Sequence, residues 1–122
     1  MTVGRVINLL ILLSLTALAG CSKKSPADEY LQDAAALKRG KSIFVGTCGA
    51  YCHSFSKGPR DAPYLFDCIW LHGGGDQDLF NSIANGVANT RMISFDGKLP
   101  DGNKDIWKII AFLKSNRESC SG

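Results

Sequence analysis

The stretch Cys48-Gly49-Ala50-Tyr51-Cys52-His53 decides which fold and chemistry to expect from this chain. Two cysteines followed at once by a histidine are typical of covalent haem attachment, in which two thiols bind the haem and the imidazole reaches the iron. The usual gap between the cysteines is two residues, whereas here it holds Gly49, Ala50 and Tyr51. A longer gap still permits both attachments if its backbone bulges outward, and Gly49 offers the conformational freedom for this. We therefore predict haem attachment at Cys48 and Cys52, with His53 as an axial ligand of the iron.

Two other interpretations of this stretch stay open from the six residues alone. One is a local disulfide between Cys48 and Cys52. The other is half of a zinc site, although no second cysteine or histidine pair with ligand spacing follows in the chain.

The first twenty residues are predicted to be an export signal. Arg5 precedes an apolar run from Val6 to Ala19, which is shorter than the ~20 residues that a membrane-spanning helix needs. The run ends in Leu18-Ala19-Gly20-Cys21, which resembles the lipobox of bacterial lipoproteins. This resemblance implies acylation of Cys21, with an ordinary cleaved signal as the alternative. Ser22 stands where an aspartate would signal retention in the inner membrane, so the resemblance favours the outer membrane.

Behind the signal at residues 1–20, the chain is predicted to form a lipidated polar tether at 21–29, one domain at 30–117 and a tail at 118–122. The whole chain has 14 basic and 11 acidic side chains, so its charge is close to balance and gives no field for binding nucleic acid. A domain of this size folds alone with a modest core. A haem at its centre would add apolar contacts.

Three helices are predicted from the spacing of apolar residues, and no segment shows the period of two that marks a strand. The predicted helices span residues 30–45, 76–86 and 103–117. Asp76 is the predicted N-cap of the second helix, which ends at Gly86. Glycine, proline and asparagine gather at residues 54–75 and 87–103, which are therefore predicted loops. The sequence indicates an all-α domain whose long loops wrap a cofactor.

Residues 37–115 resemble a small monohaem cytochrome c of the class I type. In that family, the N-terminal and C-terminal helices cross behind one covalently bound haem c, and the crossing pairs a glycine and an aromatic residue with an aliphatic and an aromatic residue. The matching positions in this chain are Gly40, Phe44, Ile109 and Phe112. Phe44 lies four residues before the first haem cysteine, as it does in the family. The resemblance implies the cytochrome c fold, and the extra residue between the cysteines is the main departure from it.

The resemblance also implies the partners of the iron. A proline carbonyl after the motif orients the proximal histidine in the family, and Pro63 is the matching position, with Pro59 as the alternative. Met92 is the only methionine left once the signal is removed, and it is the predicted second axial ligand, which would raise the reduction potential. His72 competes for that role, although a surface position or a propionate contact also suits it. Trp70 is predicted to donate its indole N–H to a propionate or to pack on the porphyrin edge.

Cys68 and Cys120 remain after the other cysteines have been assigned. Unpaired thiols are uncommon in an oxidising compartment, so a disulfide between these two cysteines is a possible pairing. A free Cys68 near the iron, acting as a rival ligand or a redox sensor, is the alternative.

The resemblance implies a carrier of single electrons and not an enzyme. The predicted protein is anchored by lipid in the periplasm of a Gram-negative bacterium, and passes electrons between a periplasmic dehydrogenase or respiratory complex and a downstream acceptor. A haem-based sensor or small-ligand binder is the alternative, and it requires an iron position free of Met92. A peroxidase-like enzyme would need an open distal site in which only His72 serves as acid and base.

Overall fold

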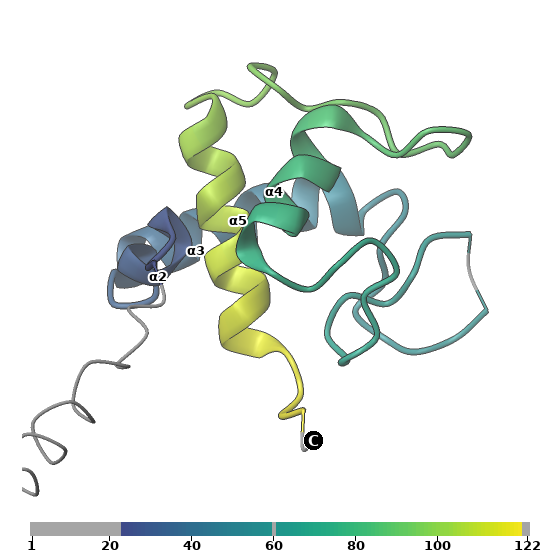
Figure 1. Cartoon of the computed structure of the whole chain (residues 1–122), viewed down its shortest axis with the longest axis horizontal. Coiled ribbons are helices and arrows are strands. Elements are labelled where there is room, and N and C mark those ends of the chain that lie inside the picture. Colours follow the sequence, from purple (N-terminus) through teal and green to yellow (C-terminus); the bar gives the residue numbers. More distant parts are fainter. Residues whose placement is uncertain (1–22, 60, 121–122) are drawn as a thin grey trace, which may run out of the picture.

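A computed structural model describes residues 23–59 and 61–120 of the chain (Figure 1). The elements are α2 (Pro26–Tyr30), α3 (Ala34–Ile43), a π-helical segment η1 (Phe44–Gly49), α4 (Asp76–Asn85) and α5 (Asn103–Asn116). No strand occurs in this part of the chain, so the predicted all-α class is confirmed. None of the described helices is long and apolar enough to cross a membrane. The predicted signal at residues 1–20 and the predicted lipidation site Cys21 lie outside the described residues.

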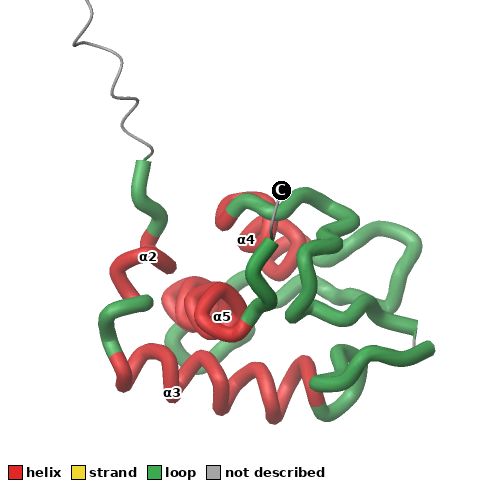
Figure 2. Tube along the Cα trace, turned by 90° about the horizontal axis from the view of Figure 1, so that it is seen from below, coloured by secondary structure: helices red, strands yellow, loops and turns green. Residues whose placement is uncertain are grey.

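Helix α5 is the centre of the fold. It contacts α2, α3 and α4, and Figure 2 looks along it, with α3 on one side and α4 on the other. Its buried residues include the apolar set predicted from the sequence, Ile106, Ile109, Ile110 and Leu113. Burying one such side chain contributes about 1.5–3 kcal/mol, so this face ties the outer helices to α5.

Helices α3 and α5 cross (Figure 1), and Gly40 of α3 lies against the backbone of α5. A Cβ atom at Gly40 would lie 2.0 Å from the carbonyl oxygen of Lys108, so only glycine allows the two backbones to approach this closely. Phe44 follows Gly40 by about one turn, and its ring centroid lies 5.6 Å from that of Phe112. Ile109 is buried beside them. The structure thus brings together the four residues at which the family resemblance places the helix crossing.

The predicted helix at residues 30–45 is divided in the structure. Asp33 ends a short turn and caps α3, because its carboxylate accepts the backbone N–H groups of Ala35 at 2.9 Å and Ala36 at 3.1 Å. Such a cap satisfies donors that the first helical turn leaves free. The continuous helix was a wrong prediction, because the apolar spacing that indicated it lies entirely after Asp33 and does not mark where the helix begins.

The polar tether predicted at residues 21–29 is wrong for residues 26–29, which form most of helix α2. The signals for this helix are a proline in its first turn and a backbone N–H of Ser25 that donates to the Asp28 carboxylate at 2.8 Å. Ala27 is fully buried. Asp28 of this segment binds to α5, whereas Glu29 is exposed.

Lys114 of α5 joins α2 and α4. Its ammonium lies 2.6 Å from the Asp28 carboxylate and 2.7 Å from the Asp76 carboxylate, and the Ser25 hydroxyl donates to Asp76 as well. Asp76 is therefore not the N-cap that the sequence predicts. Gly75 holds that position, because the carboxylate of Asp76 is engaged by groups that are distant in the sequence.

A buried carboxylate fixes the start of α5 to α3. Asp105 is 0% exposed and accepts hydrogen bonds from Arg39 Nε at 2.6 Å, Arg39 Nη2 at 2.8 Å and the backbone N–H of Asp101 at 2.9 Å. These bonds, with that of Arg39 as the largest cause, lower the pKa of Asp105 to about 2. Asp105 therefore stays ionised in the folded protein across ordinary pH.

The low pKa of Asp105 predicts that the free energy of unfolding depends on pH in the acidic range. The ionised pair contributes fully above the unfolded pKa, about 4, and its contribution is lost as the pH falls through about 2, the folded value. We expect Asp105→Asn to lower the free energy of unfolding by about 2 kcal/mol at neutral pH. Urea titrations of both proteins should show this difference shrinking below pH ~4. A difference of constant size down to pH ~2.5 would contradict the assignment.

Candidate haem site

A cavity of about 760 Å³ opens between the end of η1, helix α4 and the two long loops. Its volume falls in the range of roughly 300–1,000 Å³ that is usual for cofactor sites. The sequence-predicted site residues on its wall are Cys48, Cys52, His53, Pro63, Trp70, His72 and Met92. Residues predicted from separate segments of the chain therefore meet in one place, including both candidates for the distal ligand.

Cys48 and Cys52 are free thiols in the structure, so the local disulfide considered from the sequence is not formed. Burial, with a smaller effect of the nearby Cys52, raises the pKa of the Cys48 thiol to about 11. Cys48 is thus a neutral thiol at neutral pH. Among residues 23–59 and 61–120, no group of three or more histidine, cysteine or acidic side chains gathers as metal ligands would. The zinc interpretation therefore lacks a ligand set.

The extra residue of the motif is accommodated in a helical turn. The backbone N–H of His53 donates to the Cys48 carbonyl at 2.9 Å, and the N–H of Cys52 donates to the same carbonyl at 3.0 Å. Gly49 does not have the positive φ of a left-handed bulge. Gly49 is therefore not the flexible residue that the sequence predicts, because the backbone stays hydrogen-bonded and helical through Gly49.

His53 is held in one tautomer by the carbonyl oxygen of Pro63. The imidazole is 9% exposed, and its Nδ1 lies 2.9 Å from that oxygen. A carbonyl only accepts, so Nδ1 carries the proton and the lone pair of Nε2 is free for a metal. Orientation of this kind also strengthens a histidine ligand. The partner of His53 is Pro63 and not the alternative Pro59.

The loop that carries Met92 is held against the end of α4. Val87 donates its backbone N–H to the Met92 carbonyl at 3.0 Å, and the Thr90 hydroxyl accepts the Met92 N–H at 3.1 Å. A Cβ atom at Gly86 would lie 2.6 Å from the Met92 carbonyl oxygen. Sequence reasoning identified Gly86 only as a helix end. Its role in admitting the Met92 backbone was missed because a close approach by another segment leaves no local signal beyond the glycine itself.

An ion pair links the two long loops at the cavity. Arg91 Nη2 lies 2.5 Å from Asp61 Oδ2, and the side chains are 73% and 79% exposed. Both residues line the cavity. A pair this exposed contributes at most about 1 kcal/mol to stability, so it holds the two loops together only weakly. The sequence did not predict it, because nothing local relates two residues 30 positions apart.

The wall of the cavity fits a large apolar cofactor that brings its own acceptors. Leu71, Ile69 and Ile93 are apolar wall residues that are 60–70% exposed, and a bound planar group would cover such side chains. The Trp70 Nε1 atom is buried and has no acceptor among the described residues. A buried N–H of this kind is expected to find a partner, and a haem propionate is an acceptor. The cavity therefore offers the groups that a haem would need, namely two thiols, an imidazole, an apolar wall and a free hydrogen-bond donor.

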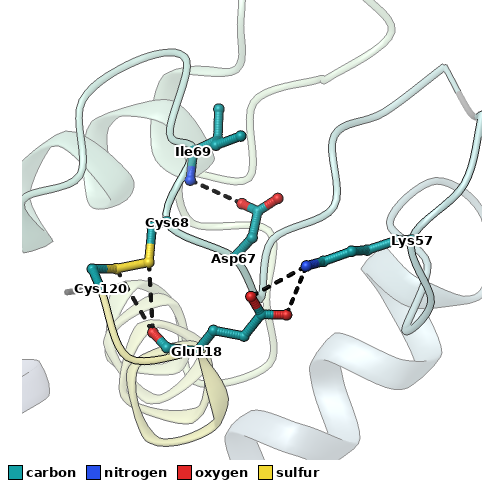
Figure 3. Close-up of a disulfide and its surroundings, with 6 residues drawn as sticks. All are labelled: Lys57, Asp67, Cys68, Ile69, Glu118 and Cys120. Atoms are coloured by element: carbon teal, nitrogen blue, oxygen red, sulfur yellow. Dashed lines mark hydrogen bonds and ion pairs between the residues drawn. A yellow bond between two sulfur atoms is a disulfide. The ribbon is translucent and has the colours of Figure 1, made fainter.

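The loop that carries Trp70 is pinned to the C-terminal segment (Figure 3). Cys68 and Cys120 form a disulfide with their Cα atoms 5.6 Å apart, and the backbone N–H of Glu118 donates to the Phe66 carbonyl at 2.8 Å. The Glu118 carboxylate also lies 2.9 Å from the Lys57 ammonium. Residues 118–120 are therefore attached to the loop that carries Trp70, where the sequence predicted a tail.

The fold of this chain is similar to that of a protein of known structure. No family model matches the chain. A solved structure, cytochrome cL from the marine methylotrophic bacterium Methylophaga aminisulfidivorans, is similar with a TM-score of 0.62 and 25% identity, covering 83% of this chain and 72% of that one. The chain therefore has the all-α cytochrome c fold, which confirms the fold that the resemblance implies.

A curated relative narrows the comparison. The CcoP subunit of the cbb3-type cytochrome c oxidase of Rubrivivax gelatinosus is 29% identical over 90 residues, which are 72% of this chain and 29% of that protein. The chain thus spans less than a third of the length of this relative. Together the two similarities support a cytochrome c and imply covalently bound haem c.

Proposed function

We propose that this chain is a monohaem cytochrome c that carries single electrons. The observation that supports the proposal is one cavity whose wall bears two free thiols, an imidazole with its Nδ1 committed to a carbonyl, and a methionine. The proposed cofactor is one haem c, attached at Cys48 and Cys52. Its iron supplies one-electron chemistry by alternating between the ferric and ferrous states.

The axial ligands proposed are His53 and Met92. His53 donates its Nδ1–H to Pro63, which makes it a stronger ligand through Nε2. Met92 would hold the iron on the side opposite His53, where a methionine ligand would raise the reduction potential and would leave no position open to substrates or small gases. A filled position suits a carrier and not an enzyme. Trp70 is proposed to donate its free indole N–H to a propionate.

We propose a periplasmic location with a lipid anchor at Cys21, behind a signal at residues 1–20, and the outer membrane as the more favoured site. The Leu18-Ala19-Gly20-Cys21 sequence supports lipidation. The disulfide between Cys68 and Cys120 supports an oxidising compartment, in which such bonds persist.

The proposed partners are redox proteins. The relative from Rubrivivax gelatinosus is by name an oxidase subunit, which supports a component of a respiratory chain as one partner. A periplasmic dehydrogenase as the other rests on the family resemblance of the sequence. Near-balanced charge gives no reason to propose nucleic acid.

Absorption spectra of the purified protein, oxidised and reduced and then in alkaline pyridine, test the proposal. We expect covalent haem, a low-spin spectrum with a methionine–iron charge-transfer band, and a haemochrome of two thioethers. Met92→Ala should remove that band while leaving the haem attached, and should lower the potential by a sizeable part of the roughly 0.8 V that axial ligands span. His72→Ala is the matched control and should change neither.

Each other outcome points to a specific alternative. If His72→Ala changes the spectrum and Met92→Ala does not, the distal ligand is His72. A high-spin wild-type spectrum, with carbon monoxide binding to the ferrous protein without denaturant, would favour a sensor or small-ligand binder over a carrier. Absence of covalent haem would refute the proposed function.

A further inference from the structure

The haem motif of this chain ends in a π-type turn. The His53 N–H donates to the carbonyl five residues earlier, that of Cys48, and a bond of this span defines a π-turn. The same type of bonding runs through η1 (Phe44–Gly49), which leads into the motif. Such segments are rare and short, and they are frequent at functional sites.

A π-turn is the simplest helical conformation that accommodates one extra residue in a turn. An α-turn closes on the fourth residue after its carbonyl, whereas a π-turn closes on the fifth. In a motif with two residues between the cysteines, the histidine is the fourth residue after the first cysteine. In this chain His53 is the fifth after Cys48. The π-turn therefore restores the backbone bond from the histidine to the first cysteine that an α-turn would make in the shorter motif.

The turn is clamped from outside by an aromatic ring. A Cβ atom at Gly49 would lie 3.0 Å from Cε2 of Phe55, so the ring rests on the glycine. The Phe55 ring lies edge-on to Phe44 at 5.3 Å between centroids and stacks on Phe66 at 5.5 Å. Phe55 is half-exposed, so burial alone does not explain its position. Its contacts hold the residues after His53 against the turn.

We propose that this π-turn lets the chain attach haem through a motif with three residues between its cysteines, and that Gly49 and Phe55 are positioning residues for the turn. The proposal rests on the proposed function, because it concerns the same haem site. It makes the turn type, and not loop flexibility, the condition for two thioether bonds.

Changes of length in the gap test this directly. Ala50 is exposed and does not line the cavity, so its deletion and the insertion of one alanine after it are the least disruptive pair. The deletion should convert the π-turn to an α-turn and keep both thioethers. The insertion leaves no helical turn of matching span and should lose at least one. Intact mass after acid–acetone extraction and the pyridine haemochrome count the bonds.

A pair of glycine substitutions tests the clamp. Gly49→Ala must displace the Phe55 ring, whereas a Cβ atom at Gly46 in the same π-helical segment meets nothing within 4 Å among the described residues, its chain neighbours and its own helix backbone aside. In the haem-loaded protein, we expect Gly49→Ala to speed hydrogen exchange of the His53 amide by roughly tenfold, with little change for Gly46→Ala. The NMR spectrum of the backbone amides reports this without any activity measurement.

The outcomes separate the two proposals. A wild-type protein without covalent haem overturns the proposed function and this inference with it. Covalent haem in the wild type, combined with a tolerated insertion or with loss of a thioether in the deletion, overturns the inference alone. Equal exchange rates in the two glycine variants would remove Gly49 and Phe55 as positioning residues.

Discussion

Replacing His53 by alanine is expected to abolish stable haem incorporation. The change removes the proposed proximal ligand. It also leaves the Pro63 carbonyl without its donor, which in the wild type is the imidazole Nδ1 at 2.9 Å. Loss of an outer-shell partner alone costs a metal site about 10–100-fold in affinity, so loss of the ligand itself should lower haem content by at least about tenfold. The pyridine haemochrome per mole of protein measures this content.

His72→Ala is the matched control, because His72 is exposed, lines the same cavity, and is the only other histidine of the chain. It should retain a full complement of haem. If His53→Ala instead yields holoprotein with the native spectrum and the native haem content, His53 is not the proximal ligand.

Replacing Gly40 by alanine is expected to have the largest effect on folding. The added Cβ would lie 2.0 Å from the Lys108 carbonyl oxygen and 3.1 Å from the Ile109 nitrogen, and backbone atoms cannot turn aside as a side chain does. The helices must separate, which loosens the Phe44–Phe112 contact behind the site. Overpacking of a core costs about 1–3 kcal/mol, and this backbone clash belongs at the upper end. A loss of about 3 kcal/mol corresponds to roughly 15 °C in the thermal midpoint of a domain of this size.

Gly46→Ala serves as the control for the glycine-to-alanine change itself. It lies in the next segment of the chain, and a Cβ there meets nothing within 4 Å among the described residues, its chain neighbours and its own helix backbone aside. Alanine favours helix over glycine by up to about 1 kcal/mol, so its midpoint should stay level or rise slightly. Midpoints of Gly40→Ala and Gly46→Ala that agree within error would show that α3 and α5 do not depend on the close approach at Gly40.

The features that were predictable from the sequence have local signals. The helix at Asn103–Asn116 carries four apolar residues on one stripe, and its predicted bounds differ from the structure by one residue at the end. The residues on the cavity wall could be predicted because a haem motif specifies the residues expected to bind haem. Only Met92 and His72 then remained as candidates for the second axial ligand. The cytochrome c fold was implied by the family resemblance, which rests on the motif and on residues such as Gly40 and Phe44.

The features that were missed depend on partners outside the element in which the residue was interpreted. Asp76 looked like an N-cap, but it bonds to Lys114 of α5. Asp28 looked like part of a solvated tether, but it bonds to the same lysine. Gly86 looked like a helix end, and its contact with the Met92 backbone appears only when the loop has closed. In each case the local sequence pattern did not indicate which residue the side chain or backbone contacts in the folded protein.

By itself, the sequence determined α5, most of α4, and the thiols and imidazole of the motif, because periodicity and motif spacing act over a few neighbouring residues. Gly40 was implied by the family resemblance, and its need for glycine comes from the backbone of α5. Only the tertiary structure decided that the extra residue of the motif is taken up in a π-turn. Only it also showed that α2 folds onto α5 and that Cys68 joins Cys120. The physical reason is that a turn type and an ion pair are chosen by the free energy of packing against distant segments, which no window of sequence contains.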